Sequence, residues 1–477
     1  MGKPMKVLLI SSNRCAQPAP VLPAGACMVA EAAEEAGHDV RLLDLMFSRD
    51  PAAEVRAAIA QGKPEVIGLS VRNIDNNDMQ GPECYMGGLD AVVGAVREST
   101  DAPVVLGGAA AGVMPAQLLR RTGALCAVTA DGQGVFPELL ENLSSPGARE
   151  MPGTAWPEDG SAVLNPPRRA ELRAARQPDY PRWLDMKAYS ASMATVPLQT
   201  KLGCHFRCVY CTYRKIEGNR YRCLSPEDAA AAVEGLVAMG LRDIEFVDNV
   251  FNAPYAHAMA VCGAIAHARP GARLQSLELN PLFVDGGLLS AMGRAGFSAV
   301  GVTAESASDQ VLEGLGKGFT RQDLARAAGA VRRHSLPCLW IFMLGGPGET
   351  EATVEETIRF AETELRPSDV AFFNAGVRIY PGTALEAVAR REGLLSLPPS
   401  EMLEPVFYLS PGLDPVWLIR RIGRALEENM NFTGSATLAY PHLPLINRLC
   451  RRIGLRPPLW RHTRHIRRGL RMLGAKA

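Results

Sequence analysis

The stretch Lys201–Tyr213 reads KLGCHFRCVYCTY and places Cys204, Cys208 and Cys211 within eight residues, at a Cys-x3-Cys-x2-Cys spacing. Thiolates are soft ligands that suit zinc or an iron–sulfur cluster. A structural zinc needs a fourth ligand, and the nearest candidate, His205, directly follows Cys204, where the backbone can hardly bring both side chains to one ion. Three cysteines on a tight loop therefore favour a [4Fe–4S] cluster with one iron left open. A zinc loop and three buried structural cysteines are the alternatives.

The composition indicates an α/β protein of two or three domains, since the chain has 477 residues and a domain takes about 150. The net charge of +1 gives no overall field for nucleic acid. The eleven cysteines are odd in number and mostly scattered, which indicates a reducing compartment rather than a disulfide framework. No signal peptide opens the chain and no run of about 18 apolar residues occurs, so we expect a cytoplasmic protein without a membrane span.

Residues 1–143 alternate apolar runs of strand length with helical patterns. Strands are expected at 5–11, 39–45, 66–71, 104–108 and 125–130, and helices at 24–36, 52–61, 89–98, 115–122 and 135–142. Five strands alternating with helices predict a doubly wound parallel sheet of flavodoxin-like type. Ligands of such a sheet sit beyond the carboxyl ends of its strands, so the loops that follow these strands are candidate binding loops.

Residues 144–195 are rich in Pro, Arg and Ala and predict a linker packed on the surfaces that it joins. The βα pattern resumes in residues 196–384. Strands are expected at 196–202, 243–247, 276–279, 299–303, 338–344 and 369–379, and helices at 226–239, 255–268, 287–295, 321–334 and 352–364. Six parallel strands predict a partial (β/α)6 barrel with its active site at the carboxyl ends of the strands. Residues 385–477 are expected to form a mostly helical C-terminal region.

The cysteine loop, with Tyr210 before its last cysteine, resembles the radical S-adenosylmethionine (SAM) superfamily. Four further motifs follow in order at predicted strand ends, and they resemble the family's acidic or Asn pair and its GIES…KG, PGET and PGT elements. They are Asp248-Asn249, Glu305-Ser306 within GVTAESASDQVLEGLGKG, Gly345-Gly346-Pro347 within GGPGET, and Pro381-Gly382-Thr383. Taken singly, Glu305 could be only a helix cap and the glycine turn only a turn.

The resemblance implies the chemistry of the family. The three cysteines hold a [4Fe–4S] cluster, its open iron binds the amino and carboxylate groups of SAM, and an electron from the cluster cleaves SAM to a 5′-deoxyadenosyl radical. The residues implied to contact SAM are Tyr210, Asp248, Glu305, Ser306, Gly345, Gly346 and Pro347.

The N-terminal loops resemble the cobalamin-binding domain found before many radical SAM cores. Residues 68–70 read GLS, 107–108 read GG, and 131–134 read DGQG, where Gln133 and the following Val135 depart from the family's GEGE turn. The loop after the first strand reads SNRCAQPAP and lacks the Asp-x-His-x-x-Gly motif, so none of its residues is expected as an axial histidine. A ligand-free fold or another nucleotide cofactor is the alternative. The residues implied to line cobalamin are Ser12, Asn13, Ser70, Val71, Arg72, Gly107, Gly108, Gly132 and Gly134.

The combined resemblance predicts a cobalamin-dependent radical SAM methyltransferase that acts on an unactivated carbon or on phosphorus. A second prediction keeps both cofactors but forms a ring or another bond without methyl transfer. A methylthiotransferase acting on tRNA would need further cluster cysteines, for which the N-terminal region offers only the widely spaced Cys15, Cys27, Cys84 and Cys126. A non-catalytic sensor is the alternative outside enzymes. The expected partners are a small-molecule or lipid substrate and an external electron donor of flavodoxin or ferredoxin type.

The C-terminal region suggests two further features. Its residues 385–445 are expected to cover the barrel mouth with aromatic side chains that suit a lipid, an aromatic amino acid or a packed core, namely Phe407, Tyr408, Trp417, Phe432 and Tyr440. No acidic residue follows Glu428, and ten basic residues lie in the last thirty positions. These basic residues accompany two apolar stripes at helical spacing, Ile446/Leu449/Cys450/Ile453 and Ile466/Leu470/Leu473. Such helices either lie on an anionic membrane surface as a peripheral contact or, more commonly, pack onto their own protein.

Overall fold

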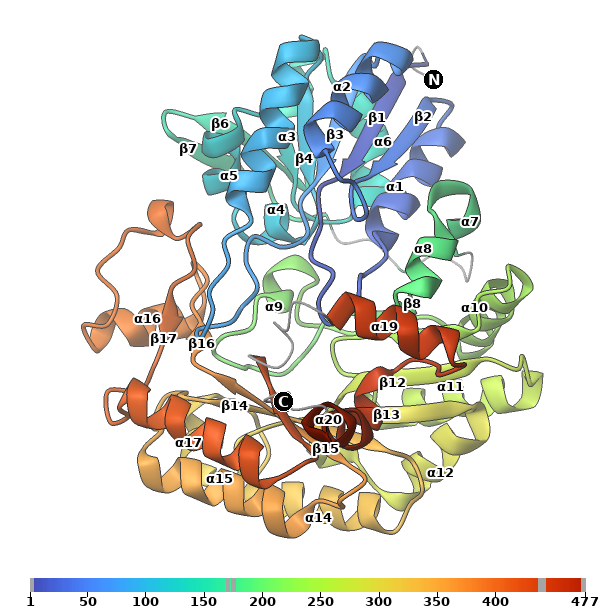
Figure 1. The fold of residues 1–477 in the computed structure, drawn as a ribbon. Helices are drawn as coiled ribbons and strands as arrows, with labels where there is room; N and C mark the ends of the chain where they lie inside the picture. Colours follow the sequence, from blue (N-terminus) through green and yellow to red (C-terminus); the bar gives the residue numbers. More distant parts are fainter. Residues whose placement is uncertain (1–3, 169–171, 173–176, 436–442, 473–477) are drawn as a thin grey trace.

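The computed structural model describes residues 4–168, 172, 177–435 and 443–472, and it contains two α/β halves stacked one on the other (Figure 1). The N-terminal half lies at the top of the figure and the second half at the bottom. Each half is organised around its own large sheet of seven strands. Loops from both halves meet between them, and the candidate site is built there.

The N-terminal sheet has the strand order β2-β1-β3-β4-β5-β6-β7. Its first five strands run parallel, which confirms the predicted flavodoxin-like order. Their continuous apolar sequences are what a sheet covered on both faces requires. The five strands are β1 (Lys6–Ser11), β2 (Asp39–Asp44), β3 (Val66–Ser70), β4 (Val104–Gly107) and β5 (Cys126–Val128).

Helices cover both faces of this sheet. Val7 and Leu9 of β1 belong to the core shared with α1 (Ala24–Glu35) and α6 (Gly132–Asn142). The alternate residues of β1, Leu8 and Ile10, belong to the core on the opposite face. That second core is completed by α2 (Pro51–Gly62), α3 (Met86–Ser99), α4 (Ala109–Val113) and α5 (Pro115–Thr122). The short helix α4 was not predicted.

The predicted linker, residues 144–195, is in part wrong. Strands β6 (Thr154–Glu158) and β7 (Ser161–Leu164) pair antiparallel and extend the edge of the N-terminal sheet beyond β5. Pro157 interrupts their local pattern, but proline is tolerated at a sheet edge. The remaining elements of this segment are η1 (Pro146–Glu150), α7 (Tyr180–Trp183) and α8 (Met186–Ala191). The segment is therefore mostly packed structure.

The second sheet has the order β18-β15-β14-β13-β12-β11-β8, and every pairing in it is parallel. Six of its strands confirm the predicted barrel. They are β8 (Val196–Leu198), β11 (Asp243–Phe246), β12 (Arg273–Leu279), β13 (Phe297–Glu305), β14 (Cys338–Leu344) and β15 (Val370–Ala375). The seventh strand, β18 (Phe432–Gly434), comes from the C-terminal region and was missed because three residues carry no periodicity. It follows α17 (Pro415–Glu428).

The helices between these strands lie where the sequence predicts them. They are α10 (Pro226–Ala238), α11 (Tyr255–Ala268), α12 (Gly286–Ala295), α14 (Arg321–Arg332) and α15 (Glu351–Glu364). Thr320 and Thr350 form capping boxes that start α14 and α15. The short helix α13 (Asp309–Gly314) was not predicted.

Two predicted barrel strands are each divided in the structure. Residues 196–202 form β8 and then β9 (Lys201–Leu202), which pairs antiparallel with β10 (Arg222–Cys223). Residues 369–379 form β15 and then β16 (Val377–Arg378), which pairs antiparallel with β17 (Phe407–Tyr408). Gly376 separates the last two with a φ of 74°, a left-handed conformation that favours glycine.

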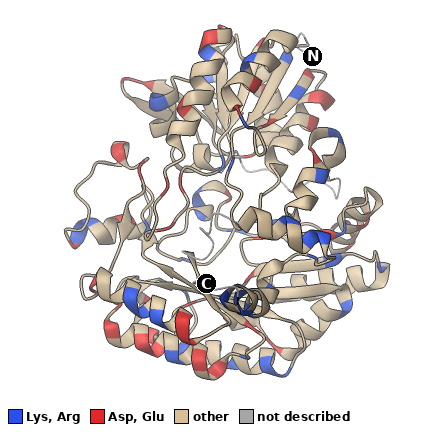
Figure 2. Ribbon diagram, in the orientation of Figure 1, with Lys and Arg blue, Asp and Glu red and all other residues tan. Residues whose placement is uncertain are grey.

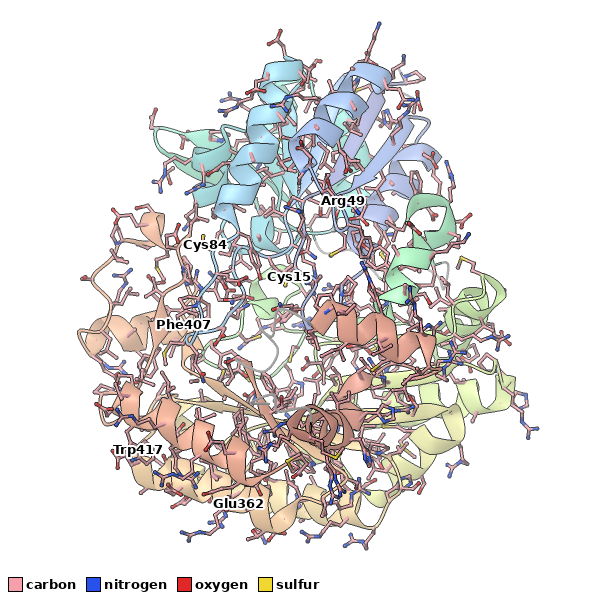
Figure 3. The ribbon with its side chains drawn as sticks, in the orientation of Figure 1. Cys15, Arg49, Cys84, Glu362, Phe407 and Trp417 are labelled. Carbon is pink, nitrogen blue, oxygen red and sulfur yellow. The ribbon has the colours of Figure 1, made fainter. Side chains whose placement is uncertain are left out.

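The aromatic residues of the C-terminal region lie mainly in the core and not over the barrel mouth. Tyr408 is fully buried and donates its hydroxyl to Glu392, and Phe432 packs against Phe373 with ring centroids 5.3 Å apart. Trp417 packs against the barrel core from α17, at the side of the molecule (Figure 3). Tyr440 lies outside the described residues.

The C-terminal helices α19 (Leu443–Arg452) and α20 (Thr463–Met472) confirm the predicted helix pair. Arg467 of α20 donates to the backbone carbonyls of Leu426, Asn429 and Phe432, so this part of the tail packs onto the protein. The predicted stripe on α19 is divided between two faces, because Cys450 is buried and Ile446 is half-buried while Leu449 and Ile453 are exposed. The side chains of Leu470 and Leu473 lie outside the described part of the chain. No helix among the described residues is long and apolar enough to cross a membrane.

A buried ion pair joins the two halves. Asp75, in the loop after β3, and Arg378, in β16, are 0% and 3% exposed and lie 2.8 Å apart. Arg378 also donates to the backbone carbonyls of Ile379, at 2.6 Å, and Met402, at 3.0 Å. The Asp75 carboxylate further accepts the backbone N–H of Asn77 at 2.9 Å. Both charges are therefore fully satisfied, as burial requires.

More contacts surround this ion pair. The hydroxyl of Tyr380 donates to the Asn77 side chain at 2.9 Å. Met79 lies against Gly376, where a Cβ would come within 2.5 Å of its sulfur. On a separate part of the joint, α5 contacts η3 (Pro399–Glu401), and Gln117 donates to the carbonyl of Pro399 at 3.0 Å. The orientation of the halves is thus fixed at more than one point.

We expect Arg378→Met to lower the free energy of unfolding by about 3–5 kcal/mol, because it leaves the Asp75 carboxylate buried without its partner. Urea denaturation followed by circular dichroism measures this loss. The matched control is Arg56→Met, which breaks the Arg56–Glu98 pair of 2.8 Å whose side chains are 49% and 63% exposed. That variant is expected to lose under about 1 kcal/mol. Equal losses in the two variants would contradict the assigned role of Arg378.

Candidate functional site

The three cysteines lie on the loop between β9 and the short helix α9 (Tyr213–Ile216). All three are free thiols, with Cys204 buried and the other two half-buried. Burial raises the pKa of Cys211 to about 11 and also raises that of Cys204. Thiols of this kind are held as ligands once a positive iron centre replaces their protons.

Backbone hydrogen bonds hold the cysteine loop to three other segments of the chain. Cys204 N donates to the carbonyl of Gly218 at 3.1 Å. Val209 N donates to the carbonyl of Leu315 at 3.0 Å, and the Val209 carbonyl accepts from Leu385 N at 2.9 Å. The loop is therefore set in place by the protein alone.

Asp248 supports the start of this loop. Its carboxylate is fully buried and accepts from Thr200 N at 2.7 Å, Thr200 Oγ1 at 2.6 Å and Lys201 N at 3.0 Å. Burial lowers the pKa of Lys201, whose ammonium lies 3.8 Å from Asp248 and donates to the carbonyl of Phe251 at 2.5 Å. The carboxylate oxygens of Asp248 are thus engaged by the protein, and its contact with SAM stays a prediction.

A buried network joins the cysteine loop to the end of β13. Tyr210 donates to the Glu305 carboxylate at 2.8 Å, and Lys317 lies 3.0 Å from both groups. Burial lowers the pKa of Lys317, but the negative charge of Glu305 and the hydrogen bond to the Tyr210 oxygen outweigh it and raise the pKa overall. Burial and the Glu305 charge raise the pKa of Tyr210, so its proton stays in place. The loop and the barrel are therefore linked by a charge-assisted set of hydrogen bonds.

The backbone at Glu305 is unusual. Its φ of 61° is a left-handed value, which residues other than glycine keep only where their surroundings hold them. The neighbouring Ser306 is buried, lies 3.1 Å from the Thr357 hydroxyl and accepts from Ser308 N at 3.2 Å. Glu305 thus points into the site, while Ser306 anchors the turn. Their SAM contacts stay predictions.

The Gly345-Gly346-Pro347 turn follows β14. Gly345 has a φ of 102°, and its N–H donates at 3.0 Å to the buried Glu349 carboxylate, whose pKa burial raises to about 7. Pro347 packs against Gly314 at the end of α13, and a Cβ on Gly346 would lie 2.8 Å from Leu315. The turn therefore brings backbone close to the cysteine loop, as the SAM prediction requires.

Three carboxylates from neighbouring strands, Glu245, Glu278 and Glu305, influence one another in the barrel. Burial, followed by the charge of Glu305, raises the pKa of Glu278 to about 7. Glu245 accepts from Thr195 at 2.7 Å and from Gln275 at 2.6 Å. Burial raises the pKa of Glu245, while the charge of Arg72 from the N-terminal half lowers it. The predicted cobalamin loop that carries Arg72 therefore faces the barrel acids.

The predicted cobalamin loops meet at the lower edge of the N-terminal sheet. Ser12 donates to the Ser70 carbonyl at 3.0 Å, so the loops after β1 and β3 are joined. Val71 N donates to the Gly107 carbonyl at 2.9 Å, which joins the loop after β4 as well. Gly108, with a φ of 87°, packs against the backbone of Val71. The DGQG turn begins α6, where the Asp131 side chain accepts from Gly134 N at 3.3 Å and Gly132 lies against Val29.

These loops fit a large planar ring. A Cβ built on Gly107 meets no atom within 4 Å, so this strand end faces open space. Asn13 is 8% exposed and its Nδ2 has no hydrogen-bond partner among the described residues, which leaves a buried donor available. His38, the first histidine of the chain, accepts from Met5 N at the opposite end of β1.

The cysteine loop fits an iron–sulfur cluster better than zinc. Within the part of the chain that the structure describes, no three His, Cys, Asp or Glu side chains lie together as they would around one metal ion. A cubic cluster binds each cysteine at a different iron, so its ligands stand farther apart. Cys204, Cys208 and Cys211 are the residues that would hold it.

Two family models match the chain on the two halves described above. The B12 binding domain matches residues 18–140, and the radical SAM superfamily matches residues 199–361. The chain thus combines a B12-binding domain and a radical SAM domain. It is an enzyme, and its cofactors are a [4Fe–4S] cluster, SAM and cobalamin.

Similar proteins include several methyltransferases. An uncharacterized methyltransferase of Pyrococcus horikoshii is 28% identical over 368 residues, which cover 75% of this chain and 76% of the relative. Tryptophan 2-C-methyltransferase of Streptomyces laurentii is 23% identical over 440 residues, which cover 79% of this chain and 73% of the relative. The solved structure of the radical SAM methyltransferase TsrM of Kitasatospora setae has a TM-score of 0.84 at 23% identity and covers 99% of this chain and 100% of that one. TsrM therefore shares the fold of both halves.

Three polar residues of this radical SAM site were missed from the sequence. Lys317 lies in the KG of the motif that contains Glu305, and that motif could have pointed to it. Glu278 and Glu217 belong to no motif. Glu217 is revealed only by its contacts, because its carboxylate accepts from Gly203 N at 2.9 Å and from Asn249 at 2.5 Å beside the cysteine loop.

Replacing Cys204, Cys208 or Cys211 by Ala is expected to reduce bound iron and SAM cleavage to background, because each change removes one of only three protein ligands of the cluster. Iron analysis and quantified 5′-deoxyadenosine measure the two effects. The control is Cys223→Ala, an exposed cysteine on β10 that is expected to keep both. A Cys208→Ala protein with normal iron and normal cleavage would contradict the assignment.

We expect Gly107→Val to weaken cobalamin binding about 5- to 150-fold, since overfilling a packed space costs about 1–3 kcal/mol. Because the new side chain meets no protein atom, the thermal midpoint of the cobalamin-free protein should stay unchanged. Gly87→Val, at another exposed glycine whose Cβ would meet nothing within 4 Å, is the control. Titration with hydroxocobalamin followed by absorbance tests this, and equal affinity in Gly107→Val and the control would contradict the predicted cradle.

Proposed function

We propose that this chain is a cobalamin-dependent methyltransferase that adds a methyl group to an unactivated carbon, or to phosphorus, of a small molecule. The observation that carries the proposal is the arrangement of the two halves. The strand ends of the B12-binding half face the cysteine loop and the strand ends of the barrel, and the buried Asp75–Arg378 pair fixes this orientation. The two predicted cofactor surfaces thus face each other across the joint.

When bound, the cluster and SAM supply a 5′-deoxyadenosyl radical, and cobalamin supplies a methyl group, which side chains cannot do. The chain contributes binding and orientation. Cys204, Cys208 and Cys211 hold the cluster, and the Tyr210–Glu305–Lys317 network orients the loop on which they lie. Glu278, whose pKa is raised to about 7, holds or releases a proton near neutral pH beside the same network.

Methyl transfer is favoured over the other outcomes by the relatives, two of which are methyltransferases. Methylthio transfer, which would need further cluster-binding cysteines close together, is disfavoured by the positions of the N-terminal cysteines. Cys27 and Cys126 are buried in separate cores, so they are not available together to one cluster. Cys15 lies 3.3 Å from the Tyr85 hydroxyl instead. Bond formation without methyl transfer is left as the competing outcome of the test below.

The substrate and partners belong to the same proposal. An aromatic amino acid is the first candidate substrate, because the Streptomyces laurentii relative is named for tryptophan, and a lipid is the second. Cluster reduction calls for an external electron donor of flavodoxin or ferredoxin type. We place the enzyme in the cytoplasm, with peripheral contact to a membrane surface through its C-terminal helices.

Methyl transfer is tested with SAM that carries a CD3 group. The reconstituted enzyme, with cobalamin and a one-electron reductant, is expected to convert its substrate to a product that is heavier by one CD3 group. Tryptophan and then a lipid extract are the substrates offered, and mass spectrometry detects the product. Omitting cobalamin is expected to abolish the product, and Cys208→Ala is the inactive control. A product that forms with 5′-deoxyadenosine but without the label would favour cyclisation or another bond-forming reaction instead.

A further inference from the structure

Among the described residues, helix α19 contacts the rest of the protein through one of its faces. Asn447 is 3% exposed and donates to the Pro18 carbonyl, in the loop after β1, at 3.0 Å. Arg451 donates to the hydroxyl of Ser190 in α8 at 2.9 Å, and Cys450 is buried between them. The helix therefore spans the side of the joint between the two halves (Figure 1).

The opposite face of α19 is apolar and exposed. Leu445 is 65% exposed, Leu449 is 58% exposed and Ile453, just past the helix end, is 69% exposed. They follow one another at intervals of four residues, so they form one line along the helix. Large apolar side chains are exposed singly on most proteins, but three in line on one helix form a patch. We call these three residues the α19 line.

Positive charge surrounds the α19 line. Arg448, Arg452 and Arg456 are all exposed, and the first two stand three residues after Leu445 and Leu449, on the same face. Residues 443–472 contain nine arginines and no acidic residue. Figure 2 shows blue on α19 and α20 without red between them. An apolar line flanked by arginines is the pattern of a helix that lies in the plane of a membrane surface.

We propose that the α19 line and its flanking arginines dock on a lipid surface that contains anionic headgroups. The positive charge around the α19 line distinguishes among the partners that could dock on this surface. A second copy of the chain docked on this face would bring the exposed Arg448, Arg452 and Arg456 against their counterparts, and these repel. A nucleic acid would neutralise the arginines but would leave the three apolar side chains in water. A bilayer with anionic lipids both neutralises the arginines and removes the apolar side chains from water. The α19 line enters the interface while the arginines remain at the phosphates.

This docking places the loop after β1, which holds Asn447, beside the membrane. Because that loop also belongs to the predicted cobalamin surface, the joint between the halves would lie next to the bilayer. The inference does not depend on which reaction the enzyme performs, since it concerns a surface outside the site. Membrane docking can therefore be disproved while the proposed methyl transfer stands, and methyl transfer can be disproved while membrane docking stands.

Co-sedimentation of the full-length protein with vesicles tests the proposal. The wild type is expected to bind vesicles of phosphatidylglycerol and phosphatidylcholine, and to bind pure phosphatidylcholine much less. Leu445→Ser/Leu449→Ser/Ile453→Ser is expected to lower binding more than about tenfold, because three apolar side chains no longer enter the interface. Arg448→Gln/Arg452→Gln is expected to lower it about fivefold for each arginine removed, and binding should fall as salt is raised.

The matched control is Val416→Ser/Ile419→Ser on α17, where the two apolar side chains are 53% and 40% exposed and acidic residues lie on the same helix. It is expected to bind vesicles as the wild type does. All variants should keep the wild-type thermal midpoint, since the changed residues are exposed. The proposal is overturned if the wild type does not bind anionic vesicles, if the triple variant binds as well as the wild type, or if the line instead mediates self-association or RNA binding.

Discussion

A buried ion pair, Asp75–Arg378, lies at the centre of the contacts that set the relative position of the two halves. Arg378 and Asp75 come from elements 303 residues apart in the chain, and water reaches neither. A buried charge without a partner is strongly destabilising. Sliding one half on the other would separate Arg378 from Asp75 and is therefore unfavourable. The Arg378 guanidinium also donates to three backbone carbonyls. Because the group is planar, these hydrogen bonds fix its orientation. The joint is therefore set by geometry as well as by charge.

A second polar network holds the cysteine loop in a fixed position against the barrel. Tyr210 lies between two cysteines of the loop, and its hydroxyl reaches Glu305 on β13 and Lys317 beyond α13. Lys317 lies 3.0 Å from the Glu305 carboxylate, so each of these two buried groups has a partner of opposite charge. The strained backbone of Glu305 is held by this pairing and by Ser306. The cysteine loop is thus oriented by side chains from the barrel, and the joint then orients the barrel against the B12-binding half.

The elements that could be predicted from the sequence are those encoded by local periodicity and by short motifs. The strands and helices of both sheets, the cysteine loop and the glycine turns follow from apolar spacing and from glycine positions, and they lie close to their predicted places. The strands β6 and β7 were missed because Pro157 interrupts their pattern, and β18 because three residues carry no periodicity. Arg378 and Glu278 were missed because their environment is made by elements distant in the sequence. The SAM and cobalamin contacts assigned to single residues stay predictions, because no bound group tests them.

The charges of the two halves complement each other across the site. The barrel contributes Glu245, Glu278 and Glu305 from three adjacent strands, and the B12-binding half contributes Arg72, whose charge lowers the pKa of Glu245. Opposite charges across a low-dielectric space attract over longer distances than in water. Lys317 lies 3.0 Å from Glu305 and also lowers the pKa of Glu278 against the larger effect of burial. The joint therefore brings one positive charge of the B12-binding half, Arg72, toward a set of acids that the barrel partly balances with its own lysine.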